Sequence, residues 1–134
     1  MTQMTQIEKI VENDLSYISR GCVFDVYNEL GPGLLESIYE AALAYELREK
    51  GLNVKTQVGL PVRYKDTQLD LGYRIDILVE DKVIIELKSN ETIIDVHHKQ
   101  VLTYLKLTKL KLGLLINFNS DDISKSIYRK VNNL

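Results

Sequence analysis

Apolar residues recur at helical spacing in the first third of the chain. The spacing predicts one helix over residues 14–30 and a second over residues 34–50, because side chains three or four positions apart share a helix face. The run Gly31-Pro32-Gly33 separates them, and Gly51 ends the second. The expected inward faces comprise Ile18, Cys22, Val23, Val26, Tyr27 and Leu30 in the first helix and Leu35, Ile38, Tyr39, Ala42, Leu43 and Leu47 in the second.

The period then changes from helical to alternating. Residues 53–58 and 61–64 are expected to form short strands, and residues 71–80 and 83–87 form longer strands joined by a tight turn. Residues 95–108 return to helical spacing. The nearly continuous apolar run 111–118 is typical of a strand buried on both faces. Residues 123–131 fit either a short helix or an edge strand. This order predicts an α/β domain with a mixed sheet covered by helices.

Length and composition favour a single globular domain over residues 1–134. The chain is 45% apolar and 27% charged, close to an ordinary globular protein. No apolar run approaches the roughly 18 residues of a membrane span, and the first residues lack a signal-peptide core. The single Cys22 excludes an intramolecular disulfide framework. We therefore expect a cytoplasmic protein with no membrane partner.

Charge is unevenly distributed along the chain. The net charge is −2, which gives no global attraction to nucleic acid. Residues 1–50 carry a net charge of −5 and residues 51–134 a net charge of +3, and residues 96–120 hold four lysines and no acid. A local basic surface is one interpretation, and an ordinary solvated face is the other.

The strand predicted over residues 71–80 carries a polar pattern on an apolar background. Alternate side chains of a strand share a face. We therefore expect Arg74, Asp76 and Leu78 on one face, and Ile75 and Ile77 on the other.

The following strand has the same property. Glu86 and Lys88 are two positions apart and are expected to project together. If the two strands pair as a hairpin, Asp76 lies beside them. Carboxylate oxygens are natural ligands of Mg²⁺, which lowers the pKa of a bound water and neutralises charge on a phosphate. Lys88 can orient the attacking water or stabilise the transition state. The alternative is a cross-strand salt bridge worth about 0.2–1 kcal/mol.

The helix over residues 95–108 offers a second polar set. His97, Gln100 and Tyr104 share one face, and His98 is expected to point to solvent. Gln can hydrogen-bond a carboxylate or phosphate, and Tyr can stack on a base. The alternative is an ordinary helix with a half-buried Tyr.

Glu36 and Tyr39 form a third set near the start of the second helix. An acid in a first turn gains about 0.3–1 kcal/mol from the helix dipole, so a structural role for Glu36 and a core role for Tyr39 stay open. The functional interpretation makes Glu36 a third acid at the metal site.

Taken together, these motifs resemble a known family. Gly33-x-x-Glu36-x-x-Tyr39, Arg74-x-Asp76, Glu86-x-Lys88 and Gln100-x-x-x-Tyr104 occur in the order and spacing of the GxxExxY family of the PD-(D/E)xK nuclease-like superfamily. The resemblance covers roughly residues 18–118. Ile75 stands where the superfamily's name has proline.

The resemblance implies a restriction-endonuclease-like core, a mixed sheet flanked by helices. It implies Asp76, Glu86 and the Leu87 carbonyl as metal ligands, with Lys88 as the catalytic lysine. Glu36 matches the acid that the first-helix region supplies in related exonuclease-type members, and Gln100 and Tyr104 match a motif that supports the active site and the substrate strand.

Two functions follow from these residues. The first is a Mg²⁺-dependent nuclease, with Mn²⁺ as a substitute, acting on DNA in preference to RNA. The second is a non-catalytic accessory module that binds nucleic acid or protein on a nuclease-like fold. A domain this small is expected to need a homodimer mate or a partner subunit. Substrate contacts are expected from Arg74, His97, Lys106 and Lys109.

Overall fold

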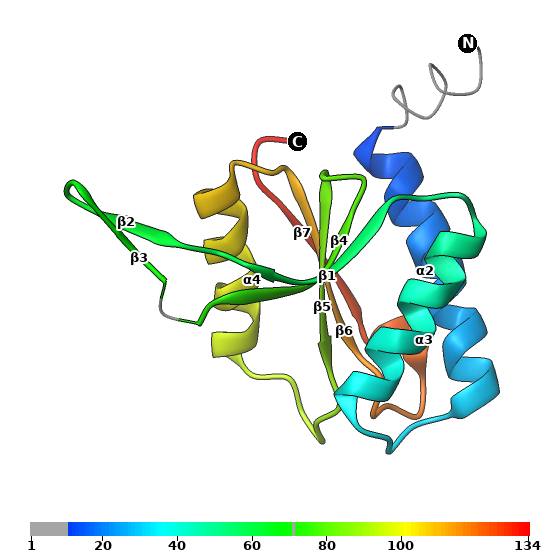
Figure 1. Ribbon diagram of the computed structural model, residues 1–134. Coiled ribbons are helices and arrows are strands. Elements are labelled where there is room, and N and C mark those ends of the chain that lie inside the picture. Colours follow the sequence, from blue (N-terminus) through cyan, green and yellow to red (C-terminus); the bar gives the residue numbers. More distant parts are fainter. Residues whose placement is uncertain (1–10, 71) are drawn as a thin grey trace, which may run out of the picture.

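A five-stranded mixed sheet forms the centre of the protein, in a computed structural model that describes residues 11–70 and 72–134 (Figure 1). Its strand order is β1-β4-β5-β6-β7. The strands are β1 (Val54–Gly59), β4 (Arg74–Val79), β5 (Val83–Lys88), β6 (Leu112–Asn117) and β7 (Ile127–Val131). Leu71 was expected to begin a strand, but it lies outside the described residues. So do residues 1–10, which belong to the segment that lacks a signal-peptide core.

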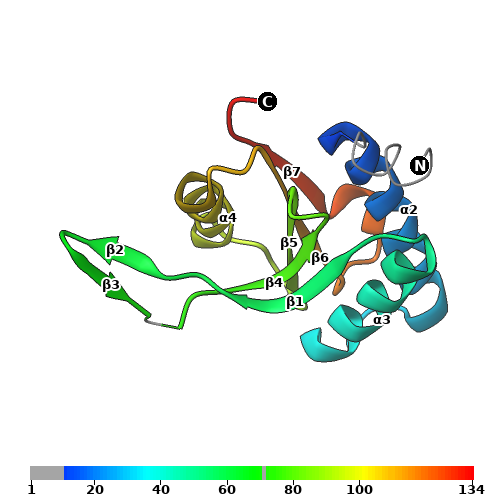
Figure 2. The same cartoon turned by 45° about the horizontal axis from the view of Figure 1, so that its top comes forward.

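Helices cover both faces of this sheet. Helices α2 (Glu12–Leu30) and α3 (Glu36–Glu49) lie on one face, and α4 (Asp95–Thr108) lies on the other (Figures 1 and 2). Each face has its own apolar core. The larger core joins α2 and α3 to the sheet, and the smaller joins α4 to it. The predicted mixed sheet flanked by helices is confirmed.

The connections follow from the sequence pattern. β4 and β5 pair antiparallel around a tight turn, as expected for two alternating segments separated by three residues. β5 and β6 pair parallel, which requires a crossover, and α4 supplies it. Every residue of β6 is buried, as its unbroken apolar run predicts. The last segment contains both alternatives, because the short 3-10 helix η1 (Ile123–Lys125) precedes the edge strand β7.

A second, two-stranded sheet extends from the body as an arm. It consists of β2 (Val62–Tyr64) and β3 (Thr67–Leu69), which pair antiparallel. Figure 2 shows the arm projecting past α4, away from α2 and α3. Strand β3 was not predicted, because it is three residues long and carries no apolar alternation.

The turn between α2 and α3 depends on its glycines. Gly31 and Gly33 have φ angles of 68° and 95°, in the left-handed region that favours glycine. The expected inward face of the second helix is partly wrong here. Leu35 is 72% exposed and Ile38 is 43% exposed, because the helix begins only at Glu36 and its first turn extends beyond the core.

None of the helices among residues 11–70 and 72–134 is both long and apolar enough to cross a membrane.

Gly113 allows α4 to pack closely on the sheet. A Cβ atom at this position would lie 2.7 Å from Cγ1 of the buried Val101 on α4. Gly113→Ala is therefore expected to lower the free energy of unfolding by about 1–3 kcal/mol. Gly21→Ala is the matched control, because Gly21 lies inside α2 with nothing within 4 Å of such a Cβ, and it should stabilise the protein by about 0.5–1 kcal/mol. Urea denaturation measures both, and equal effects would contradict the close approach.

Candidate active site

The pairing between β4 and β5 stops at the position of Asp76. The paired register runs from Val79–Val83 to Ile77–Ile85. Beyond it, the carboxylate of Asp76 takes the place of the next backbone partner, since the Leu87 amide donates to Asp76 Oδ2 at 2.9 Å. The two strands therefore separate with a carboxylate between them.

A break in side-chain alternation accompanies this separation. Ile75 belongs to the core under α4, whereas Ile77 belongs to the core under α2 and α3. The prediction that these two isoleucines share a face is therefore wrong. Gln57, on the neighbouring strand β1, has a φ of 52°, which extended strand residues do not adopt. The register between β1 and β4 omits the pair formed by Gln57 and Asp76, so the regular ladder is interrupted at this position.

Glu86 meets Asp76 inside this gap. Glu86 is 3% exposed, and its Oε1 accepts from the Asp76 amide at 3.4 Å. Burial raises the pKa of the Glu86 carboxyl well above its ordinary value, and its contact with the Asp76 carboxyl adds to the rise. The Lys88 ammonium opposes that rise, which shows that it lies within electrostatic range. In the metal-free protein, burial and the neighbouring carboxyl both favour a proton on Glu86.

Leu87 and Lys88 complete the strand side of the gap. The amide and carbonyl of one strand residue point to the same side of the strand, so the Leu87 carbonyl also points toward β4. Lys88 is half-buried, and its backbone carbonyl accepts from Phe118 at 2.9 Å. The ion pairs among the described residues are Lys55–Asp81 and Lys125–Asp122, so the salt-bridge alternative for Lys88 has no counterpart in the structure.

Helix α3 supplies acids from the other side. Glu36 and Glu40 line a cavity of about 270 Å³ together with Gln57, Asp76 and Leu87. Gln57 Nε2 donates to Glu40 Oε1 at 2.6 Å and to Asp76 Oδ1 at 3.4 Å. Burial raises the pKa of Glu40, the Gln57 hydrogen bond opposes this, and the charges of Asp76 and Glu36 reinforce it. Three carboxyl groups thus border one small cavity.

The start of α3 is held in position by Tyr39. Its hydroxyl donates to the Gly31 carbonyl at 2.6 Å and accepts from the Leu34 amide at 3.0 Å. Its ring stacks on Phe118 with centroids 4.3 Å apart. Ser89 Oγ, just after β5, donates to the Leu34 carbonyl at 2.6 Å. These contacts make Tyr39 a buried core residue that fixes the acid-bearing turn of α3 relative to β5.

Helix α4 borders the carboxyl pair on the opposite face of the sheet. Gln100 Nε2 donates to the hydroxyl of Tyr104 at 3.0 Å, and Tyr104 is 2% exposed. Burial raises the pKa of Tyr104, and the nearby charge of Glu86 adds to the rise. Tyr104 is therefore a buried neighbour of the site, and Gln100 orients it.

The remaining predicted residues lie at different distances from the pair. Arg74 is exposed at the start of β4, and His97 lines a cavity with Gln100 and Tyr104. Lys106 and Lys109 line a separate cavity with Lys111, Asn132 and Asn133. The structure therefore groups His97 with Tyr104 and keeps the two lysines apart from the carboxyl pair.

The prediction that His98 points to solvent is wrong. Its ring meets Tyr128 edge-on at 4.9 Å, and its Nδ1 is buried. Burial lowers the pKa of His98. The sequence pattern left the segment that forms β7 open between a helix and a strand. It therefore could not predict that a tyrosine of β7 packs on His98.

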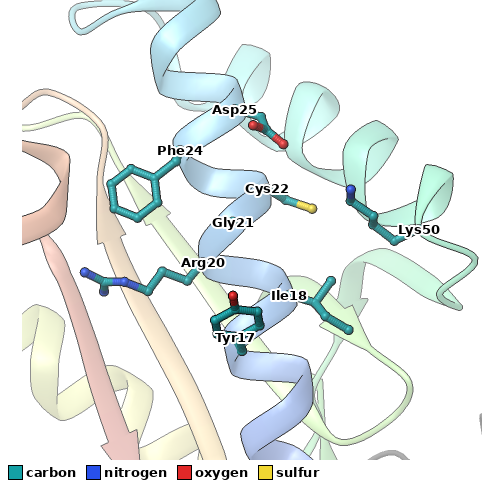
Figure 3. Close-up of a pocket in the computed structure, with 8 residues that line it drawn as sticks. All are labelled: Tyr17, Ile18, Arg20, Gly21, Cys22, Phe24, Asp25 and Lys50. Atoms are coloured by element: carbon teal, nitrogen blue, oxygen red, sulfur yellow. The ribbon is translucent and has the colours of Figure 1, made fainter.

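The largest of the described cavities lies elsewhere. It has a volume of about 570 Å³ and lies along α2, beside Tyr17, Cys22 and Lys50 (Figure 3). Figure 3 shows the Cys22 thiol and the Lys50 ammonium on the side of α2 that faces α3. Its surface is mostly apolar and contains none of the paired acids. The largest of these cavities is therefore not the one that the acids border. We place the candidate active site at the acids.

Two residues at the site were missed by sequence reasoning. Glu40 is one helical turn after Glu36, so the i,i+4 spacing could have identified it. Gln57 could not be identified, because its position depends on the left-handed backbone of β1.

The donor chemistry at the gap fits a hard divalent cation. Mg²⁺ is bound through one or two carboxylates and keeps several waters. Asp76 and Glu86 provide two carboxyl groups, and the Asp76 amide donates to Glu86 Oε1 at 3.4 Å, which brings the two residues together. Among the described residues, no group of three or more His, Cys, Asp or Glu side chains is close enough to hold a metal ion. The donor set is therefore a carboxyl pair, of which Asp76 borders the cavity beside α3.

A mixed sheet with helices on both faces, and a carboxyl pair where two of its strands separate, define a restriction-endonuclease-like fold. The model of the PD-(D/E)XK nuclease superfamily matches residues 13–130. The chain therefore belongs to the PD-(D/E)XK nuclease superfamily, as its motifs predicted. Comparisons with curated proteins and with solved structures gave no match.

Tyr39→Phe tests how the turn before α3 is held. The change keeps the ring stack and removes the hydroxyl between Gly31 and Leu34, so it should lower the free energy of unfolding by about 1–2 kcal/mol. Tyr45→Phe is the control, because the Tyr45 side chain is exposed and its hydroxyl bonds only weakly to Glu49, at 3.4 Å. Chemical denaturation compares them, and a Tyr39→Phe protein as stable as the wild type would refute the role of this hydroxyl.

Glu86→Gln tests the protonated pair. Below the pKa of the unfolded chain, both states carry the proton. As pH rises above it, the unfolded chain ionises while the folded carboxyl does not, so the wild type loses stability. Glu86→Gln should therefore raise the melting temperature of the metal-free protein by a few degrees at pH 8, and by less at pH 5.

The exposed Glu29 on α2 provides the matched control for this comparison. Glu29→Gln should leave the melting temperature unchanged at both pH values. A Glu86→Gln protein that melts lower than the wild type at pH 8 would show that Glu86 is charged and satisfied in the fold.

Proposed function

We propose that the protein is a Mg²⁺-dependent nuclease that hydrolyses phosphodiester bonds of DNA, with RNA as the second candidate. The contact between Asp76 and Glu86 carries this proposal, because it brings two acids from different strands to one point. Superfamily membership supports nuclease chemistry in general. Metal dependence, the choice of DNA and membership of the GxxExxY family belong to the proposal.

In this proposal, Asp76, Glu86 and the Leu87 carbonyl hold the cation, and Glu36 and Glu40 bind its waters from α3. Mg²⁺ would supply Lewis-acid activation of a water and neutralise charge on the phosphate. Mn²⁺, with the same preference for oxygen ligands, would substitute.

Lys88 has a separate role in the proposal. It follows Glu86 by two positions, so both side chains project from the same face of β5. A fixed ammonium there orients the attacking water and stabilises charge that develops on the phosphate oxygens. Gln100 holds Tyr104 within electrostatic range of Glu86, and this pair shapes the environment of the carboxyl without entering the reaction.

Substrate binding in the proposal relies on local charge. Arg74 begins β4, two residues before Asp76, and His97 lines the cavity beside Tyr104. Lys106 and Lys109 form a basic surface at the C-terminal end of α4 that adds salt-dependent affinity. A second copy of the chain in a homodimer, or a partner subunit, would enlarge the surface that binds the substrate. The proposed location is the cytoplasm, in keeping with a single buried cysteine.

Lys88→Ala separates metal binding from catalysis. Cleavage of labelled DNA should fall by about 10²-fold or more, because one stabilising charge is lost in the transition state. Isothermal titration should show Mn²⁺ affinity close to that of the wild type. Asp76→Ala should lose both cleavage and the Mn²⁺ signal. Lys50→Ala, beside the cavity along α2, should change neither.

The same experiment evaluates the accessory-module alternative. The absence of a preassembled group of three or more ligating side chains among the described residues favours that alternative. If wild type and Asp76→Ala titrate alike with Mn²⁺ and neither cleaves DNA, the nuclease proposal fails and the accessory function replaces it.

A further inference from the structure

A second cavity lies between α4 and the residue that precedes β4. Its volume is about 470 Å³, within the range of pockets that hold small organic groups. Its walls include Tyr73, His97, Gln100 and Tyr104. Tyr104 belongs to this wall and also lies within electrostatic range of Glu86, so the cavity and the candidate active site share a side chain.

Tyr73 is the exposed aromatic residue of this cavity. Its side chain is 42% exposed, whereas Tyr104 is 2% exposed. The two rings meet edge-on, with centroids 5.7 Å apart and planes 67° apart. Tyr104 is itself held by Gln100. Tyr73 is therefore packed against a fixed neighbour while much of its ring remains accessible.

Polar groups surround this ring. His97 Nδ1 accepts from the Ile94 amide at 3.2 Å, so the neutral imidazole carries its proton on Nε2 and can donate there. Gln100 uses its amide nitrogen toward Tyr104, which leaves its carbonyl oxygen as an acceptor. Lys99 is exposed and adds a positive charge to the same wall. An aromatic face with a donor, an acceptor and a cation beside it matches a nucleobase and its phosphate.

We propose that Tyr73 is a stacking platform for an unpaired base of the substrate strand. The bases inside a duplex have both faces covered by neighbouring bases, so stacking on a tyrosine requires a single strand, a frayed end or a flipped nucleotide. The inference rests on the proposed nuclease function and names its substrate class as nucleic acid with unpaired bases.

The position of Tyr73 relative to the acids supports this assignment. Tyr73 precedes Asp76 by three residues, and an extended chain rises about 3.3 Å per residue, so their Cα atoms lie at most about 10 Å apart. Stacked bases repeat about every 3.4 Å along one strand. A base on Tyr73 therefore belongs to a nucleotide within a few positions of the phosphate at the carboxyl pair.

The test compares single-stranded and duplex DNA in binding assays without metal, so that cleavage does not interfere. A labelled 12-nucleotide single strand and a blunt duplex of the same sequence are titrated with wild type, Tyr73→Ala, Tyr73→Phe and Tyr17→Ala, and bound fractions are read by fluorescence anisotropy. Tyr17 is the matched control, because it is 82% exposed beside the cavity along α2. A strand containing 2-aminopurine reports stacking directly through quenching of its fluorescence.

Tyr73→Ala should bind the single strand about fivefold or more weakly and lose the quenching, because stacking on one aromatic side chain accounts for that much affinity. Tyr73→Phe and Tyr17→Ala should bind within twofold of the wild type, and duplex affinity should change little in all variants. The inference is overturned if Tyr73→Ala binds and quenches like the wild type. It is also overturned if single-strand and duplex affinity fall equally, or if the wild type does not bind the single strand.

A parallel assay with Mg²⁺ keeps the two proposals separable. Tyr73-dependent binding without cleavage would refute the nuclease proposal and retain the platform. Cleavage together with binding that does not depend on Tyr73 would retain the nuclease proposal and refute the platform. Melting curves of the Tyr73 variants confirm that each is folded.

Discussion

The candidate active site depends on the contact between the carboxyl groups of Asp76 and Glu86. Two acids in a gap of a buried sheet repel each other and lose hydration, so the pair is stable only with a shared proton or a bound cation. Each acid comes from a different strand, and the contact exists because β4 and β5 separate there. The Leu87 amide, which would otherwise lose its ladder partner, bonds to Asp76 instead. The acid pair is therefore built into the backbone pairing of the sheet.

The surrounding structure keeps this unfavourable pair in place. On one side, Tyr39 fixes the turn before α3 and with it the acids that border the cavity. On the other side, α4 lies close to the sheet over Gly113 and brings Tyr104 within electrostatic range of Glu86. Both helices are anchored in apolar cores of their own. The packing of the two apolar cores thus offsets the unfavourable free energy of holding two acids together in the gap. This balance is typical of a site that binds a charged partner.

Periodicity alone predicted most of the fold, because long apolar stripes and the buried run of β6 depend on local sequence. Nearly all of the acids at the site were also recognised, since alternation on β5 places Glu86 and Lys88 together whatever the rest of the sheet does. The failures share a cause. Strict alternation predicted one face for Ile75 and Ile77, but the ladders on both sides of β4 are interrupted at Asp76, and the two isoleucines pack in different cores. Leu35 and Ile38 were expected in the core, and the late start of α3 exposes them. Such features arise from tertiary packing, which a single sequence does not display.

Anomalous X-ray diffraction from crystals soaked in Mn²⁺ shows whether the carboxyl pair binds a divalent cation. We expect one strong peak between Asp76 and Glu86, within about 2.0–2.3 Å of their carboxylate oxygens and of the Leu87 carbonyl, with water completing the shell. The peak should be absent from crystals of the Asp76→Ala protein. If the two carboxyl groups of the wild type stay in contact with no anomalous density between them, at Mn²⁺ concentrations that label acids on the surface, the pair is not a metal site.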